Sequence, residues 1–351
     1  MPRPQVSVIM AVHNGERYLR EAMESLLCQS LHGFEFIAVD DGSTDGTGRM
    51  LEEYGAKDSR VVLLCNKHNV GLTASLNRAL SVARGELIAR QDADDVSSSD
   101  RFALQAAHMK GNPGVGLLGT AYHVVDARGE RIATHKPPVT DTEIRWQMLF
   151  HNAFCHSSVM VRRSLLQGEK GPYDERLPFA QDYDLWDRLL QRTHAANLTE
   201  PLVCFRTHDE SIASRRGEEQ GAMANGVSAR ALERLSPRHL DYEEVRALRC
   251  WYREFPGQLE ASDLALCLAI LDILDTFGRR PEVDPRVFRR IRGRWRSRVL
   301  SAVPLGAIRD GVGWARLASF VRDDPASLIR ALRVRLARRV RPAAREVCGQ
   351  G

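Results

Sequence analysis

The first 120 residues alternate short apolar runs with stretches of helical periodicity, and this repeat restricts the fold more than any other feature. Apolar runs bounded by polar turns predict strands at 6–12, 34–40, 61–65, 86–90 and 115–119. The stretches between them predict helices at 16–29, 46–54, 72–83 and 99–110. Apolar strands joined by helices predict an α/β fold with a mainly parallel sheet that is covered on both faces.

The remainder of the chain is less regular and becomes mostly helical after Arg215. A run at 157–163 is typical of a strand and a stretch at 182–192 is typical of a helix. The chain has 351 residues, enough to bury one large core and a smaller appended one. We expect an α/β domain at 1–215, a helical extension at 216–278 and an Arg-rich helical tail at 279–351.

Charge divides the chain into two parts of opposite sign. Residues 279–351 contain 19 Arg and 6 acidic residues, a net charge of +13, whereas the preceding residues carry −8. The segment 325–345 places leucine, isoleucine and valine at helical spacing among arginines. Such a helix suits an anionic membrane surface, and it could equally pack on the rest of the protein. Nucleic acid is disfavoured as a partner because few aromatic residues accompany these arginines.

The sequence gives no signal for membrane insertion or export. Its apolar runs are shorter than the roughly 20 residues that span a bilayer, and the N-terminus enters a strand without an apolar leader. Seven cysteines without CxxC spacing indicate free thiols, so a zinc site is not expected. We therefore expect a cytoplasmic protein, which would lie peripherally on the inner face of the membrane if its tail binds there.

Three polar loops follow predicted strands, at 13–16, 40–47 and 91–95. Because the carboxyl ends of parallel strands meet at one edge of a sheet, and ligands bind there, these loops should converge. Asp92 and Asp94 are separated by one residue, and two such carboxylates repel each other unless a cation lies between them. Mg²⁺ or Mn²⁺ would fit and would leave positions for phosphate oxygens.

Each acidic loop also has a purely structural interpretation. The carboxylates at 92–95 could cap the following helix, and Asp95 is interpreted as part of the turn into that helix. Asp40 and Asp41 could accept hydrogen bonds from a base or a ribose, or Ser43 and Asp45 could simply cap the helix after them. The chain has no P-loop motif, so a phosphate would be neutralised by metal and basic side chains.

Six segments resemble, in order, the motifs of family 2 glycosyltransferases. They are VSVIMAVHNGERYLREAMESLLCQS, FEFIAVDDGSTDGT, NVGLTASLNRAL, ARGELIARQDADD, QDYDLWDRLL and FRTHDESIAS, and they cover residues 4–215. The resemblance implies the GT-A nucleotide-sugar-binding fold, inversion at the anomeric carbon, and a catalytic domain at 1–215. It does not cover the tail.

The resemblance also implies residue roles. The residues expected to bind the nucleotide sugar are Val12, Asn14, Glu16, Asp40, Asp41, Asn69, Gly71, Asp92 and Arg206. The residues expected to bind the metal, Mn²⁺ or Mg²⁺, are Asp94, Asp92 and His208. Asp182 is expected to be the general base, although a helix N-cap is the simpler interpretation of Asp182 by itself. His208 alone would be interpreted as a surface histidine, but nearby Arg206 makes an anion-facing patch plausible.

Four residues depart from the family pattern. Ala11 and His13 replace the usual Pro and Tyr, Leu76 stands where an Arg is common, and Gln181 replaces the usual Glu beside the base. None of them removes a group that an in-line displacement requires, namely a base facing the acceptor and cations facing the leaving group.

The sequence therefore predicts metal-assisted, inverting transfer of a sugar, from a donor expected to be UDP-linked, to a hydroxyl of a glycan or lipid-linked acceptor. Two alternatives stay open. One is a catalytically degenerate nucleotide-sugar-binding subunit, for which Gln181 is the only hint. The other is a sugar nucleotidyltransferase, which would need a richer Gly- and Arg-bearing loop after the first strand.

Overall fold

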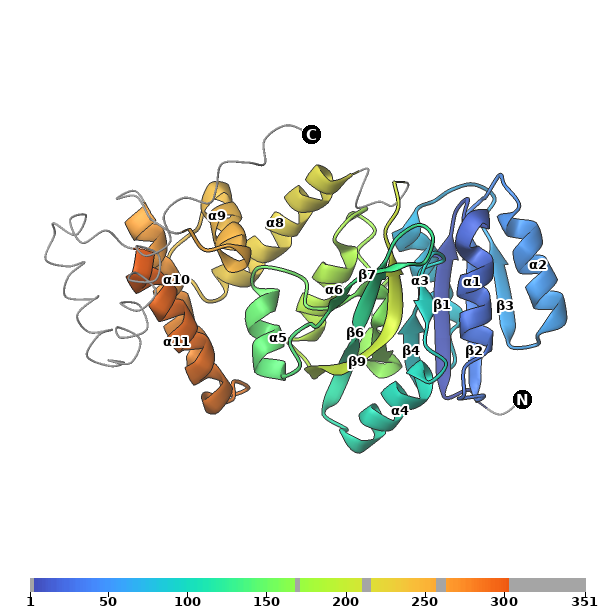
Figure 1. The fold of residues 1–351 in the computed structure, drawn as a ribbon, viewed down its shortest axis with the longest axis horizontal. Coiled ribbons are helices and arrows are strands. Elements are labelled where there is room, and N and C mark those ends of the chain that lie inside the picture. The colour runs from blue at the N-terminus through green and yellow to red at the C-terminus, as the bar shows by residue number, and fades with distance from the viewer. Residues whose placement is uncertain (1–2, 168–170, 210–215, 257–262, 303–351) are drawn as a thin grey trace, which may run out of the picture. The chain divides into compact units, whose positions relative to one another are not determined.

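The computed structural model describes residues 3–167, 171–209, 216–256 and 263–302. The chain forms two compact units, residues 1–227 and 228–351. The first contains the sheet and the helices packed on it, and the second is helical (Figure 1).

The described part of the first unit contains one nine-stranded sheet. Its strands are β1 (Val6–Val12), β2 (Phe34–Asp40), β3 (Val61–Cys65), β4 (Leu87–Arg90), β5 (Val96–Ser97), β6 (Val115–Val125), β7 (Arg131–His135), β8 (Met160–Arg162) and β9 (His194–Arg206). They run in the order β3-β2-β1-β4-β8-β6-β9-β5, with β7 paired to β6. The first four strands in this order are parallel, as are β6 and β9, whereas β8 is antiparallel to both of its neighbours.

Helices cover both faces of the sheet because side chains alternate along each strand. The helices of this unit are α1 (Glu16–Leu27), α2 (Thr47–Lys57), α3 (Leu72–Val82), α4 (Arg101–Gly111), α5 (Asp141–Met148) and α6 (Gln181–Leu189). On one face, Val8 and Met10 share a core with buried residues of α1, α2 and α4. On the other, Ile9 shares a core with buried residues of α3, α5 and α6. The predicted α/β fold with a mainly parallel sheet is confirmed.

The strands and helices up to Gly111 lie close to the predicted bounds, and most departures from the prediction fall between residues 115 and 163. Strands β1, β2 and β3 have the predicted bounds. The strand predicted at 115–119 continues to Val125, and the predicted strand at 157–163 divides into a 3₁₀ turn (His156–Ser158) and β8. Helix α5 and strands β5 and β7 were not predicted. These departures involve long-range antiparallel pairing, which leaves little local periodicity in the sequence.

The second unit is built from helices. Helix α8 (Gly217–Glu233) crosses into it and is followed by α9 (Tyr242–Arg253), α10 (Leu264–Gly278) and α11 (Pro285–Ala302). Asp241 and Glu244 form a capping box at the start of α9. The Trp295 ring of α11 contacts Tyr252 and Phe255, at 6.1 and 6.0 Å between ring centroids.

The helices of the described residues include none that is both long and apolar enough to cross a membrane. The segment 325–345, in which an amphipathic membrane-surface helix was expected, lies outside the described residues.

Candidate active site

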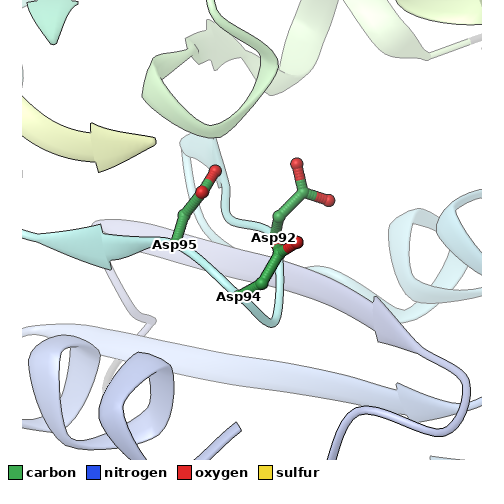
Figure 2. Close-up of side chains that lie close together, drawn as sticks. All are labelled: Asp92, Asp94 and Asp95. Carbon is green, nitrogen blue, oxygen red and sulfur yellow. The ribbon is translucent and has the colours of Figure 1, made fainter. Parts of the chain in front are cut away.

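Three carboxylates gather on the loop after β4. Oxygens of Asp92, Asp94 and Asp95 lie within 4.8 Å of one another (Figure 2). Burial raises the pKa of Asp94, and the neighbouring Asp92 carboxylate raises it further. The same two causes hold the pKa of Asp95 well above its ordinary range. The loop therefore concentrates negative charge at a buried position.

Asp95 does not occupy the position that the sequence analysis gave it. The interpretation as a turn into the next helix is wrong, because β5 follows directly and the Asp95 side chain is 0% exposed. Its Oδ1 accepts a hydrogen bond from the Arg206 backbone N–H at 2.8 Å. Its Oδ2 is buried without a hydrogen-bond partner. Asp95 is thus a third member of the acidic cluster.

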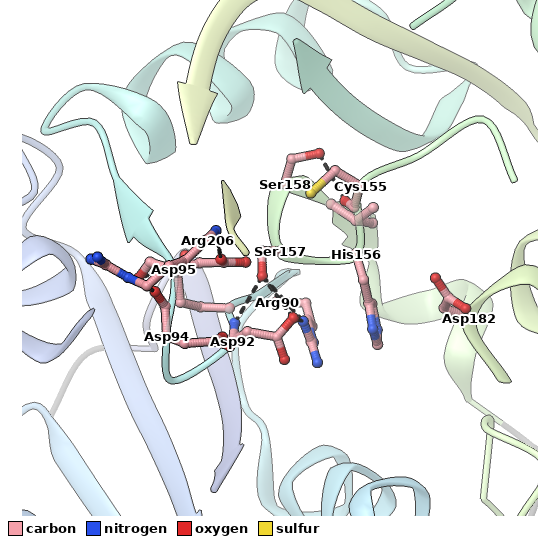
Figure 3. Close-up of polar contacts among 12 residues, drawn as sticks. Arg90, Asp92, Asp94, Asp95, Cys155, His156, Ser157, Ser158, Asp182 and Arg206 are labelled. Carbon is pink, nitrogen blue, oxygen red and sulfur yellow. Dashed lines mark hydrogen bonds and ion pairs between the residues drawn. The ribbon is translucent and has the colours of Figure 1, made fainter. Parts of the chain in front are cut away.

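Arg90, the last residue of β4, lies beneath this loop. It is 3% exposed, and its guanidinium forms an ion pair with Asp92. Ser157 joins the two, because its Oγ donates to Asp92 Oδ2 at 2.9 Å and accepts from Arg90 at 3.2 Å (Figure 3). Sequence analysis missed both residues. Arg90 occupies a buried strand position, and Ser157 lies far away in sequence.

The end of β9 holds a histidine against the acidic loop. His208 Nε2 lies 3.0 Å from Asp94 Oδ2, and the His208 ring is 5.0 Å from the ring of Tyr18 on α1. The Arg206 guanidinium packs over the same tyrosine at 4.6 Å and donates to Glu21 at 2.5 Å. The predicted neighbours Asp94 and His208 are therefore brought together. Arg206 faces protein partners, and its contact with a donor stays a prediction.

The loops after β1 and β2 are tied to each other. Asn14, with φ of 53°, accepts a hydrogen bond from the Thr44 backbone N–H at 2.8 Å. Glu16 accepts from the Gly46 N–H at 2.8 Å. The Val12 carbonyl accepts from the Asp41 N–H at 2.8 Å. These predicted donor-binding residues lie together at the carboxyl ends of β1 and β2, as expected.

Asp41 differs from the carboxylates after β4 because hydrogen-bond donors surround it. It is 3% exposed and accepts from Asn66 Nδ2 at 2.7 Å, from Val70 N–H at 2.9 Å and from Gly71 N–H at 2.8 Å. Asn69 also accepts from the Gly71 N–H, at 2.9 Å.

Neighbouring residues hold the same loop in place. Asp40 accepts from the Ser43 N–H at 3.0 Å. Gly42 has φ of 68°, and an added Cβ would lie 2.5 Å from the His68 carbonyl carbon. The β2 loop is thus held by its own hydrogen bonds and by a glycine that the close approach requires.

A cavity of about 310 Å³ opens between the acidic loop and α6. Its lining residues are Leu72, Arg90, Asp92, Asp94, Tyr122, Phe154, Cys155, His156, Pro178, Phe179, Ala180, Gln181, Asp182, Phe205, Arg206 and Gln220. It brings the predicted metal ligands Asp92 and Asp94 and the predicted base Asp182 to one space.

Asp182 lies on the α6 side of this cavity, in the first turn of the helix. Asn152 donates a hydrogen bond to its Oδ2 at 2.7 Å. Burial raises the pKa of Asp182, while a hydrogen bond from the Tyr183 backbone and the charge of Arg90 lower it. In Figure 3 the carboxylate lies apart from the acidic cluster, with the His156 ring between them. The hydrogen bond from Asn152 thus helps to orient the Asp182 carboxylate at the cavity.

His156 is a third residue that was not predicted from the sequence. Its Nε2 lies 2.9 Å from the Tyr173 hydroxyl, and its ring is 6.0 Å from that of Trp186. Burial lowers the pKa of His156 well below its ordinary value, and the charge of Arg90 lowers it further, so the imidazole is neutral. The surrounding motif, FCHSS, has neither metal-ligand spacing nor a helical period that would have identified it.

The acidic loop fits a hard divalent cation. Asp92, Asp94 and His208 supply oxygen and nitrogen donors of the kind that Mn²⁺ and Mg²⁺ accept. Within the described residues, Arg90 compensates Asp92 alone, while Asp94 and Asp95 keep raised pKa values and Asp95 keeps an unpartnered buried oxygen. Like charges at this spacing are stabilised by a cation between them.

Comparison with known proteins gives a consistent set of relatives. The model of the family described as Glycosyl transferase family 2 matches residues 7–168. The Bacillus subtilis protein named "Putative glycosyltransferase EpsE" is 38% identical over 227 residues, which cover 64% of this chain and 80% of that protein. The O-antigen biosynthesis glycosyltransferase WbnJ of Escherichia coli is 31% identical over 211 residues, which cover 59% of this chain and 81% of WbnJ.

Solved structures agree on the fold. The structure of S. aureus TarS 1-349 in complex with UDP-GlcNAc matches with a TM-score of 0.56 and 18% identity, over 96% of this chain and 92% of that one. The complex with UDP matches with a TM-score of 0.54. At this identity the likeness concerns the fold alone, which is of the GT-A type with a helical C-terminal region.

Proposed function

The chain belongs to glycosyl transferase family 2, and on that premise we propose that it transfers a sugar from a UDP-linked donor to a hydroxyl of a glycan or lipid-linked acceptor, with inversion at the anomeric carbon. One observation carries the proposal: Asp182 and the Asp92–Asp94 pair line the same cavity from different elements. An in-line displacement needs a proton acceptor on the side of the nucleophile and positive charge on the side of the leaving group.

Asp92, Asp94 and His208 would hold the cation. When bound there, Mn²⁺ or Mg²⁺ supplies positive charge that stabilises a departing nucleoside diphosphate. Arg90 and Ser157 orient Asp92 beneath the loop, and the Tyr18 ring packs against His208. The ligands are thus supported by a second layer of contacts, as preorganised ion sites require.

Asp182 would take the proton of the acceptor hydroxyl. Asn152 donates to its Oδ2 and so orients the carboxylate, which lines the cavity. Burial raises the pKa of this carboxylate, which makes its ionised form a stronger base. Because the base must be ionised, activity should be lost as the pH falls through that raised pKa.

The relatives support the substrate classes. The TarS structures contain UDP and UDP-GlcNAc, which supports a UDP-linked donor held at the loops after β1, β2 and β3. The name of WbnJ refers to O-antigen biosynthesis, and that of the Erwinia amylovora relative AmsE to amylovoran biosynthesis. These names support a glycan acceptor and a role in polysaccharide biosynthesis.

We further propose that catalysis resides in residues 1–215, that 216–278 form a helical extension, and that the tail at 279–351 binds an anionic membrane surface at the cytoplasmic face. The described start of the tail supports this, because Arg286, Arg290 and Arg294 are exposed at four-residue spacing along α11. Arginine binds phosphate headgroups well, because its planar guanidinium can donate two hydrogen bonds to one group. Packing of the tail on the catalytic domain is the alternative.

The proposal is tested by donor turnover. Purified protein is incubated with UDP- and GDP-sugars with and without Mn²⁺, and release of the nucleoside diphosphate is measured with and without a glycan acceptor. We expect Mn²⁺-dependent release from a UDP-sugar. Asp182→Asn should lower transfer at least about 100-fold, the scale of general base catalysis, with little change in donor affinity.

Asp100→Asn is the matched control, because the Asp100 carboxylate is exposed and makes no capping hydrogen bond. Undiminished transfer by Asp182→Asn would refute the role of the base. Donor binding without turnover of any donor would instead favour the degenerate binding subunit, and release of pyrophosphate from a nucleotide would favour the nucleotidyltransferase.

A further inference from the structure

We infer that the acceptor hydroxyl belongs to an uncharged sugar ring that packs on an aromatic wall of the cavity, and not to a lipid phosphate or an acidic sugar. The aromatic wall consists of Tyr122, Phe154 and Phe205, which all line the cavity that contains Asp182. The inference rests on the proposed function and specifies its acceptor.

The sheet order places the aromatic wall away from the loops proposed for the nucleotide. Tyr122 lies on β6 and Phe205 on β9, whereas those loops follow β1, β2 and β3. Strand β4, which leads into the acidic loop, separates the two groups in the order of the sheet. A donor whose nucleotide lies at β1–β3 and whose diphosphate lies at the acidic loop leaves the β6 and β9 side of the cavity for the acceptor.

The rings of the aromatic wall are held in place by neighbours. Tyr122 and Phe205 pack edge to face, with centroids 6.0 Å apart and an interplanar angle of 69°. His135 of β7 packs on Tyr122 at 4.9 Å, and Phe154 packs on Trp186 at 6.4 Å. Pockets of this kind use apolar and aromatic walls for contact and a few polar groups for orientation. The C–H face of a pyranose matches such a wall.

Amide side chains supply the polar groups. Gln181 and Gln220 line the same cavity. Each amide offers N–H donors and an acceptor oxygen, so it can donate a hydrogen bond to a sugar hydroxyl or accept one from it. Gln181 is the position at which the resemblance led us to expect a glutamate, and an amide there removes one negative charge beside the acceptor.

The cations of this cavity are already engaged. Among its described lining residues, Arg90 pairs with Asp92, and Arg206 pairs with Glu21 on α1. His156 is neutral, and the first turn of α6 presents the Asp182 carboxylate to the cavity. A phosphate or carboxylate placed beside Asp182 would lose its hydration and meet like charge without a free cation.

The need for a base also favours an alcohol as the acceptor. In the proposed transfer, the acceptor oxygen bonds to the anomeric carbon, the bond from that carbon to the diphosphate breaks with its electron pair on the diphosphate, and the hydroxyl proton passes to Asp182. A phosphate monoester, with its second pKa near about 6, is largely deprotonated at neutral pH and has little need of a base. A buried aspartate beside the aromatic wall therefore fits an alcohol.

The first experiment compares acceptors. Full-length protein with Mn²⁺ and its UDP-sugar is given neutral octyl hexopyranosides, the matching octyl hexuronides, or a polyprenyl phosphate, and glycosylated product is measured. We expect neutral glycosides to exceed both anionic classes by at least about tenfold, because an unpaired buried charge costs more than 1.4 kcal/mol. Preference for the uronide or the phosphate, or no product from any neutral glycoside, would overturn the inference.

Donor hydrolysis without acceptor is recorded in the same assay. If the donor is hydrolysed and the anionic acceptors are preferred, the inference is refuted but the proposed function still holds. If no donor is hydrolysed and no sugar is transferred, the proposed function on which the inference rests is refuted.

The second experiment tests the aromatic wall. Phe205→Ala and Tyr122→Ala should each raise the acceptor KM about tenfold, and Tyr122→Phe should restore it, because the ring face and not the hydroxyl makes the contact. If Tyr122→Ala unfolds at a lower temperature than wild type, Tyr122→Leu repeats the test with a larger side chain. Ile132→Ala, on exposed β7 and outside the cavity lining, should change the KM less than about twofold. An unchanged KM in both Tyr122→Leu and Phe205→Ala would contradict the assignment.

Discussion

Two acidic loops lie at the same edge of the sheet, one after β2 and one after β4, and their carboxylates have opposite surroundings. Asp41 of the first loop is buried among three hydrogen-bond donors. In the second loop Asp95 is buried and Asp94 half-buried beside other carboxylates, and their pKa values are raised. The Asp41 carboxylate is thus satisfied by hydrogen bonds, whereas the carboxylates of the second loop lie beside one another, an arrangement that a bound cation would stabilise.

The difference shows that a count of acidic residues does not identify an ion site. Both loops contain adjacent or alternating aspartates, and both follow buried parallel strands. What separates them is the supply of N–H donors: the backbone around Gly71 turns toward Asp41, but the loop after β4 offers few such groups. Unpaired buried carboxylates carry a desolvation cost that a bound cation removes.

The largest expected effect is on catalysis. Asp94→Asn removes a charge from the cluster while keeping the side-chain shape, so Mn²⁺-dependent turnover should fall at least about 100-fold. Treatment with EDTA should lower wild-type turnover similarly, and added Mn²⁺ should restore it. The exposed Asp100→Asn variant should match wild type. Turnover in the Asp94→Asn variant equal to that of wild type would show that the cluster has no catalytic ion.

The next effect is on stability and separates the two loops. Asp41→Ala leaves three buried donors without their acceptor and should lower the free energy of unfolding by about 3 kcal/mol. Asp94→Ala in metal-free protein should lower it by less than about 1 kcal/mol, because losing the contact with His208 is offset by relief of repulsion. Urea denaturation with EDTA measures both. Equal losses would contradict the contrast between the loops.

The smallest effect is a pH dependence. The pKa of Asp95 is raised by folding, so the folded protein binds a proton more tightly than the unfolded chain, and stability is lost as the pH rises from the ordinary value of 3.8 through the raised pKa. Asp95→Asn removes this loss and keeps an oxygen for the Arg206 N–H. In EDTA, the variant should therefore gain Tm over wild type as the pH rises, by about 2 °C or more at neutral pH.

A difference in Tm that is flat or falls with increasing pH would show that Asp95 is stabilised as a carboxylate. Added Mn²⁺ provides an internal check. It should reduce the advantage of the variant, because a cation offsets the repulsion that the substitution relieves.

Much of the fold follows from local pattern in the first half of the chain. Apolar runs bounded by turns placed β1, β2 and β3 at their observed bounds, because β1 and β2 are buried on both faces and a helix connects each strand to the next. The insertion of β8 between β4 and β6 could not be predicted, since three residues at Met160–Arg162 pair with strands that are distant in sequence.

The charged residues of the candidate site were predictable from the sequence, but the residues that contact and orient them were not. Asp92, Asp94 and Asp182 stand in motifs that carry a resemblance, and the structure brings them to one cavity. Arg90 could not be recognised as their partner because it lies in a strand of otherwise apolar residues. Asn152 contacts Asp182 across 30 positions of sequence, which no short-range period encodes.

The central claim is that the loop after β4 binds a divalent cation through Asp94. Titration of metal-free protein with Mn²⁺ in the presence of UDP, followed by electron paramagnetic resonance of the free ion, measures this directly. The account predicts one Mn²⁺ bound per chain in wild type and in Asp100→Asn, and binding at least about tenfold weaker in Asp94→Asn. Equal Mn²⁺ affinity in wild type and Asp94→Asn, or no Mn²⁺ binding by wild type, would contradict it.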